Sequence, residues 1–145
     1  NVISRENMIT YTNKINNVID KLANIVADEV SIPVTFNEHI GNHSILITPE
    51  EDNLNQIMAS GQTRDYTITM SYQLNTGGDM SENAFKQLSN TAEHLKRLFA
   101  PDNNANVTDY WFNGRVETVS YERDEEDESK VRAIITFNCT GLEAA

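Results

Sequence analysis

The sequence contains little cysteine and no long apolar stretch. Its single cysteine, Cys139, cannot form an intramolecular disulfide, and the apolar residues around it predict a buried, unreactive thiol. No uninterrupted apolar stretch approaches the roughly 18 residues of a membrane-spanning helix, so we expect no membrane partner. The first residues also lack the basic start and apolar core of a signal peptide, which favours an intracellular protein.

Basic residues are scarce as well. The 11 Lys and Arg residues are outnumbered by 22 Asp and Glu residues, and the formal net charge is −11. A protein of this charge repels phosphate backbones and anionic membrane surfaces, which argues against sequence-specific binding to nucleic acid. The acids gather in two groups that we expect to lie in loops: Glu50, Glu51 and Asp52, and then Asp124, Glu125, Glu126, Asp127 and Glu128.

Signatures of catalysis and of cofactor binding are missing too. The sequence has no glycine-rich phosphate loop, no Gly-x-Ser-x-Gly elbow and no His-Glu-x-x-His zinc motif. His39 and His43 flank a predicted turn, which does not hold residues four apart on one side as a helix does. His94 is expected to be solvated, and the acids of 124–128 lack the alternating ligand spacing of an EF-hand. We therefore expect no catalytic site, no metal and no cofactor.

Two segments show the three- and four-residue apolar spacing of amphipathic helices. The first is expected to start at Thr10 or Thr12 as N-cap and to end near Asp28. The second is expected to begin near Asp79 and to continue until Pro101. Each has one apolar stripe that needs a partner surface, for which a sheet is the obvious candidate: Ile15, Val18, Ile19, Leu22, Ile25 and Val26, and then Phe85, Leu88, Ala92, Leu95, Leu98 and Phe99.

Strict alternation of apolar and polar residues predicts strands over residues 64–74 and 131–139, each with one buried and one exposed face. Shorter apolar runs at 32–36 and 45–47 predict a hairpin around Gly41. Residues 49–62 have no sustained period and are expected to form a surface loop.

A densely aromatic segment, Tyr110, Trp111 and Phe112, precedes a further predicted strand at 116–121. The alternation slips around Asn113, which predicts a bulge or turn there. A base-stacking platform is disfavoured because such platforms combine aromatic residues with a basic groove. The cluster either belongs to the core or contacts another subunit, because one strand cannot bury three consecutive aromatic residues on one side.

These segments together predict a single domain over residues 1–145 of the α+β class. The expected order is α-β-β-β-α-β-β, with an antiparallel sheet of four to five strands and both helices on one face. The other face of the sheet stays partly polar. The acids of 124–128 would form the tip of the last hairpin, where their mutual repulsion keeps the tip solvated and poorly ordered.

The order and lengths of these segments resemble the tail-terminator (tail-completion) proteins of long-tailed bacteriophages and related head–tail connector subunits. The resemblance extends over about residues 10–140. It is carried by the two helices, by the strand from Arg64 to Met70 and by the closing hairpin of 116–121 and 131–139.

The resemblance implies a structural virion protein that forms a hexameric ring, caps the tail tube and stops its polymerisation. The ring would bind tail-tube and neck or connector proteins, and DNA would pass through its lumen. Assembly in the host cytoplasm and a final location in the virion are implied as well. An acidic lumen would let the duplex slide, and both acid groups, 50–52 and 124–128, are candidates to line it.

Three other functions stay open at this point. The chain could be another phage neck or baseplate subunit, because α+β domains of this length suit such roles by analogy. It could be a monomeric protein-binding domain that uses its hairpin tips as contacts. An enzyme would need two acids held in one cleft, whereas the acids here are expected on loops, so we predict that the protein is not an enzyme.

Overall fold

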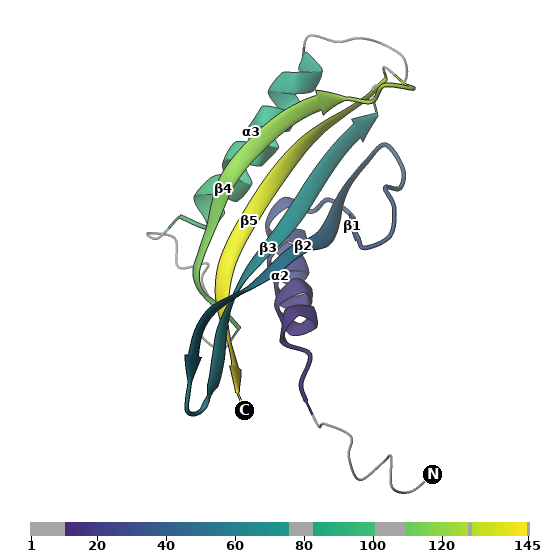
Figure 1. The fold of residues 1–145 in the computed structure, drawn as a ribbon. Coiled ribbons are helices and arrows are strands. Elements are labelled where there is room, and N and C mark those ends of the chain that lie inside the picture. Colours follow the sequence, from purple (N-terminus) through teal and green to yellow (C-terminus); the bar gives the residue numbers. More distant parts are fainter. Residues whose placement is uncertain (1–10, 76–82, 101–109, 128, 145) are drawn as a thin grey trace, which may run out of the picture.

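The computed structural model describes residues 11–75, 83–100, 110–127 and 129–144. Its elements follow the order α2 (Lys14–Val30), β1 (Val34–Thr35), β2 (His43–Met58), β3 (Gly61–Asn75), α3 (Asn83–Leu98), β4 (Phe112–Arg123) and β5 (Lys130–Ala144). The strands form one sheet in the order β1-β2-β3-β5-β4, and both helices lie on the same face of it (Figure 1). The predicted α+β class and the predicted order of elements are confirmed.

Helix α2 begins and ends at residues that satisfy its terminal backbone groups. The Oδ1 atom of Asn13 accepts a hydrogen bond from the backbone N–H of Asn16 at 3.1 Å, so Asn13 is the N-cap. The predicted N-cap at Thr12 is therefore wrong, and Thr10 lies outside the described residues. The helix runs two residues beyond Asp28, to Val30, and its C-cap Ser31 adopts a left-handed conformation with φ of 55°.

The core lies between the helices and the two central strands. Side chains of β3 and β5 that face the helices are buried, as their alternation predicted: Tyr66, Ile68, Met70 and Tyr72 on β3, and Val131, Ala133, Ile135, Phe137 and Cys139 on β5. Helix α2 adds Val18, Leu22 and Val26, and helix α3 adds Leu88 and Leu95. Each helix thus buries the one apolar stripe that its sequence predicted.

Strand β2 is much longer than the sequence predicted. It continues through Pro49 to Met58 and pairs antiparallel with β3, so the surface loop expected at 49–62 is wrong. Register shifts between Pro49 and Glu51 and between Leu54 and Gln56 mark two irregularities in this ladder. A proline is tolerated here because this part of β2 is an edge strand, where a missing N–H need not break a ladder on both sides.

The predicted hairpin of 32–36 and 45–47 is also wrong. Val34 and Thr35 of β1 pair parallel with Ile45 and Leu46 of β2, so the chain between them crosses over and returns instead of turning back tightly. The sheet is therefore mixed, with one short parallel pair beside three antiparallel pairs.

The final hairpin forms as predicted, with β4 antiparallel to β5. Its register shifts between Phe112 and Arg115, and Asn113 has a φ of 59°, which confirms the irregularity expected at this point. Among the described residues, neither helix is long and apolar enough to cross a membrane.

Candidate functional site

The first acid group lies on an exposed strand rather than in a loop. Glu50, Glu51 and Asp52 belong to β2, and all three are exposed. Asp52 forms an ion pair with Arg64 of β3, in which Nε lies 2.7 Å from Oδ1. Sequence reasoning placed these acids in a loop because neither face of β2 is buried here, so no apolar alternation marks the strand.

The outer side of β2 has little cover. Strand β1 pairs only with Ile45 and Leu46, so residues 47–58 have no strand on their outer side among the described residues. We call residues 47–58 the outer β2 edge. Three apolar side chains are exposed along it, with exposed fractions of 49% for Leu54, 73% for Ile57 and 36% for Met58. Exposed apolar side chains on an open strand edge are typical of a pairing surface.

Residues 124–127 of the second acid group lie in the β4–β5 turn, as predicted, and two of them build that turn. The Asp124 carboxylate accepts hydrogen bonds from the backbone N–H groups of Glu126 at 2.8 Å and Asp127 at 3.0 Å, and it pairs with Arg132. The backbone bond from Glu126 and then the Arg132 guanidinium hold the pKa of Asp124 below its usual value.

Asp127 organises the other half of the turn. Its Oδ1 atom accepts hydrogen bonds from the N–H and the hydroxyl of Ser129, and these two bonds lower the pKa of Asp127. The described part of the tip is therefore a hydrogen-bonded turn. Glu125 and Glu126 are exposed, and Glu128 lies outside the described residues.

The structure does not bring the two acid groups together. Glu51 lies in the same row of the sheet as Asn138 of β5, through Thr67 of β3. The β4–β5 turn lies beyond Val131 of β5. Val131 is seven residues from Asn138, so the two are about 23 Å apart along the strand at 3.3 Å per residue. If both groups face one lumen, they do so at different heights.

The aromatic segment is divided between core and surface. Trp111 is fully buried and meets Phe137 edge-on at 5.5 Å between ring centroids. Its indole N–H has no hydrogen-bond partner among the described residues. Tyr110 is partly buried beneath the ammonium group of Lys21, and Phe112 is 43% exposed. Trp111 thus takes the core role, and contact with another subunit stays a prediction for Tyr110 and Phe112.

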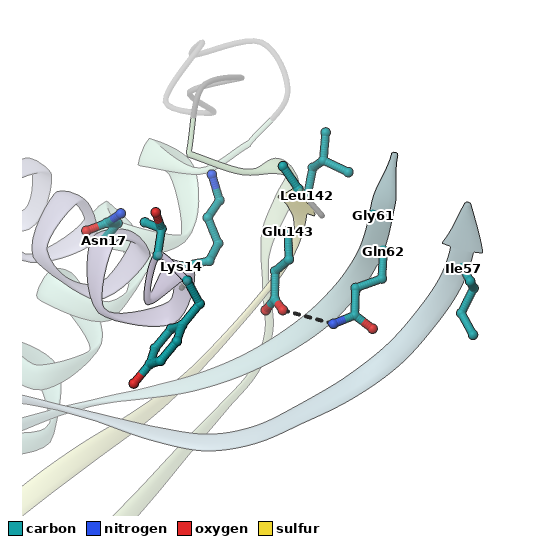
Figure 2. Close-up of a pocket in the computed structure, with 10 residues that line it drawn as sticks. Lys14, Asn17, Ile57, Gly61, Gln62, Leu142 and Glu143 are labelled. Carbon is teal, nitrogen blue, oxygen red and sulfur yellow. Dashed lines mark hydrogen bonds between the residues drawn. The ribbon is translucent and has the colours of Figure 1, made fainter. Parts of the chain in front are cut away.

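A groove lies between the start of α2 and the ends of β3 and β5 (Figure 2). Its volume is about 890 Å³. The Glu143 carboxylate accepts hydrogen bonds from Nε2 of Gln62 at 3.1 Å and from the Tyr66 hydroxyl. Burial, and then the bond to Glu143, raise the pKa of Tyr66 far above its usual value. The groove is lined by these residues: Tyr11, Thr12, Lys14, Asn17, Ile57, Gly61, Gln62, Leu142, Glu143 and Ala144.

The histidines have structural partners. The His39 ring lies 2.8 Å from the Ser44 hydroxyl and 3.2 Å from the Ser71 hydroxyl, which ties the β1–β2 connection to the sheet. His94 is exposed, as expected, and also reaches Glu29 of α2 at 2.7 Å. Within the described ranges, no three His, Cys, Asp or Glu side chains are grouped so that they could hold a metal ion.

Comparison with known proteins shows a shared fold. No protein-family model and no curated protein matches the sequence. Among solved structures, a chain from the virion of a native gene transfer agent particle is similar, with a TM-score of 0.55 and 12% sequence identity. The match covers 88% of this chain and 92% of that chain. At this identity the likeness is one of fold.

Proposed function

We propose that this chain, which shares its fold with a chain of a gene transfer agent virion, is a structural virion protein that acts as a ring-forming tail terminator. In this role it caps the tail tube and joins the tube to the head or neck, and DNA passes through the ring. The observation that carries the proposal is the likeness of fold over nearly the whole of both chains. The protein works by assembly and has no catalytic function.

The surfaces of the chain support a ring. A closed ring uses one patch of each subunit against a different patch of the next. The sheet offers two unlike edges for this purpose, the outer β2 edge and strand β4 at the other end of the strand order. In a hexamer, each of these edges would contact a neighbouring subunit, and none would stay exposed.

The charge of the chain suits passage of DNA. A ring of subunits that each carry −11 repels the duplex, so DNA can slide through without sticking. The exposed acids Glu50, Glu125 and Glu126 are the members of the two groups best placed to contribute. Asp124 and Asp127 also shape a turn, so their substitution would disturb structure as well as charge.

The test is light scattering of the purified protein over a range of concentrations, with negative-stain images of each species. The expected particle contains about six copies of the 16.4 kDa chain around a central hole. The protein is then added to growing tail tubes, where a terminator binds one end and stops elongation. A protein that stays monomeric both alone and with tube ends contradicts the proposal.

The same likeness of fold would suit another neck or baseplate subunit of the particle. The tube assay separates the two roles, because a neck or baseplate subunit assembles without arresting tube growth. The groove at the start of α2 favours a third role, that of a monomeric protein-binding domain. That role predicts a monomer that binds a partner through the groove and ignores tube ends.

A further inference from the structure

The two sides of the sheet differ in charge. Residues 14–58, which include α2, β1 and β2, contain two lysines and seven acids: Asp20, Asp28, Glu29, Glu38, Glu50, Glu51 and Asp52. Helix α3 contains one acid, Glu93, and three basic residues: Lys86, Lys96 and Arg97. In a chain with twice as many acids as basic residues, this basic helix stands out.

Helix α3 carries one of its basic residues, Lys96, on the side of β4, and Lys96 also pairs with Glu93 at 2.6 Å. The Arg123 guanidinium of β4 lies 5.2 Å from the centre of the Phe85 ring of α3, so this side of the helix adjoins β4. Lys96 follows Phe85 by about three helical turns and shares its side. The opposite side of α3 faces α2 through the contact of His94 with Glu29. We call β4 and this side of α3 the β4–α3 side.

The sheet has an open edge on each side, one along residues 47–58 of β2 and one along β4. Among the described residues, no strand lies outside β4 or outside residues 47–58 of β2. Because β2, β3, β5 and β4 pair antiparallel in turn, β2 and β4 run in opposite directions. If two copies lie side by side in the same orientation, β2 of one copy is antiparallel to β4 of the next, which permits a continuous ladder.

The register of the sheet aligns opposite charges on these two edges. Glu51 pairs with Thr67, Thr67 with Asn138, and Asn138 with Arg115, so Glu51 and Arg115 end the same row. A rotation about an axis along the strands therefore brings Glu51 of one copy to Arg115 of the next at the same height. Arg115 already meets Glu117 at 2.5 Å, but this exposed pair stabilises little, and a guanidinium has five donors.

Apolar side chains accompany the charges on both edges. Leu54 and Ile57 are exposed on the outer β2 edge. On β4, Phe112 is 43% exposed and Tyr121 is 45% exposed. The outer β2 edge is thus acidic and aliphatic, whereas β4 is aromatic and carries two arginines, Arg115 and Arg123, beside two glutamates, Glu117 and Glu122.

We propose that the outer β2 edge docks on the β4–α3 side of a second copy of this chain, with Glu51 beside Arg115 of that copy. The contact is heterologous, because two different patches meet, and repetition of it with a fixed rotation closes a ring. The inference rests on the proposed ring function and adds the surfaces that join its subunits. Attraction between Glu51 and Arg115 also offsets part of the general repulsion between copies that each carry −11.

The test uses cross-linking between introduced cysteines. In one copy the two positions lie three strand spacings apart, about 14 Å, which is too far for an internal disulfide. The native Cys139 is buried and gives little background.

The variant with both Glu51→Cys and Arg115→Cys is oxidised and separated by denaturing electrophoresis. We expect a ladder of covalent oligomers from the double variant and none from either single variant. Asp28→Cys with Arg115→Cys is the matched control, which is expected to give no ladder.

Charge reversal provides an independent measurement. Glu51→Lys and Arg115→Glu should each raise the dissociation constant of the wild-type assembly by at least about tenfold. The double variant that exchanges the two charges should recover most of the loss.

The cross-linking and assembly results together separate failure of the proposed contact from failure of the ring function. A wild-type ring that gives no double-variant ladder overturns the proposed contact and leaves the ring function standing. A disulfide dimer of the Glu51→Cys single variant shows an isologous contact and overturns the proposal as well. If the wild type is monomeric alone and on tube ends, and no ladder forms, both the contact and the ring function are wrong.

Discussion

The hydroxyl of Tyr66 donates a hydrogen bond to the carboxylate of Glu143, and this bond joins the buried centre of β3 to the exposed end of β5. Gln62 binds the same carboxylate at 3.1 Å (Figure 2). The bond therefore helps to fix the end of the sheet near which the outer β2 edge terminates.

Tyr66→Phe removes this bond and keeps the buried ring. We expect a loss of about 1 kcal/mol in the free energy of unfolding, because Glu143 is left with Gln62 and with water as partners. Urea unfolding followed by the fluorescence of Trp111, the one tryptophan of the chain, measures the change. A Tyr72→Phe variant serves as a comparison on the same strand. Unchanged stability of Tyr66→Phe would show that water replaces the bond without loss.

Gly141→Ala tests the close approach of the Tyr66 ring to β5. A Cβ atom at position 141 would lie 2.6 Å from Cε2 of Tyr66, so the ring or the strand must move. We expect a loss of about 1–3 kcal/mol in the free energy of unfolding. In a Tyr66→Leu background the same substitution should cost much less, because the ring that it meets is gone. Equal costs in the two backgrounds would exclude the ring as the cause.

Trp111→Ala and Phe112→Ala should separate the core from the contact surface. Removing the buried indole should lower the free energy of unfolding by about 3–5 kcal/mol. Removing the exposed Phe112 ring should change it by less than about 0.5 kcal/mol, yet weaken assembly. Unfolding is followed by circular dichroism, because the first variant has no tryptophan, and assembly is followed by light scattering. If both variants fold and assemble like the wild type, the aromatic segment is not part of the contact between copies.

Asp124→Asn should change the dependence of stability on acid pH. The pKa of Asp124 is lowered in the folded protein from its ordinary value of 3.8, so its ionised form stabilises the fold above about pH 3.8. That contribution is lost as the pH falls through the lower, folded-state pKa. The variant should be less stable near pH 7 and should lack this part of the acid decline. Melting temperatures at several pH values between neutrality and pH 3 measure both effects, and parallel curves for the two proteins would contradict the prediction.

Leu54→Ser together with Ile57→Ser should weaken assembly and preserve the fold. Both side chains are exposed, with fractions of 49% and 73%, so their loss should change the free energy of unfolding by less than about 0.5 kcal/mol per residue. The apolar contact that we propose they make with a second copy would be lost. Phe36→Ser, at an exposed position on the β1–β2 connection, is the control and should leave assembly unchanged. If Phe36→Ser weakens assembly more than the Leu54→Ser and Ile57→Ser variant does, the β1–β2 connection and not the outer β2 edge makes the contact.

The sequence predicts an element well where one of its faces is buried. Strands β3 and β5 show strict alternation because Tyr66 to Tyr72 and Val131 to Cys139 place every second side chain in the core. The amphipathic helices are predictable for the same reason. Residues 49–58 of β2 lack that signal, because both faces meet solvent and the strand is held by backbone bonds to β3. Their mixed Asn, Gln and acidic composition is then indistinguishable from that of a loop.

Prediction of the candidate site fails where it depends on pairing between distant strands. The alignment of Glu51 with Arg115 exists only through Thr67 and Asn138, and no local pattern reveals that row. The parallel pairing of β1 is equally hidden, because two residues are too few to show a direction. The aromatic residues at 110–112 left a core role and a contact with another subunit as alternatives, and the structure gives the core role to Trp111.

The position of β5 in the sheet affects how the protein can be made. Strand β5 follows every other described strand in the chain, yet it lies between β3 and β4. During synthesis β4 emerges before the strand that holds it in the sheet, so a nascent chain that ends before Lys130 cannot present β4 as a fixed edge. The two edges proposed to join neighbouring copies therefore become available together only after β5 is inserted. If the proposed ring forms, this order would keep unfinished chains from joining it.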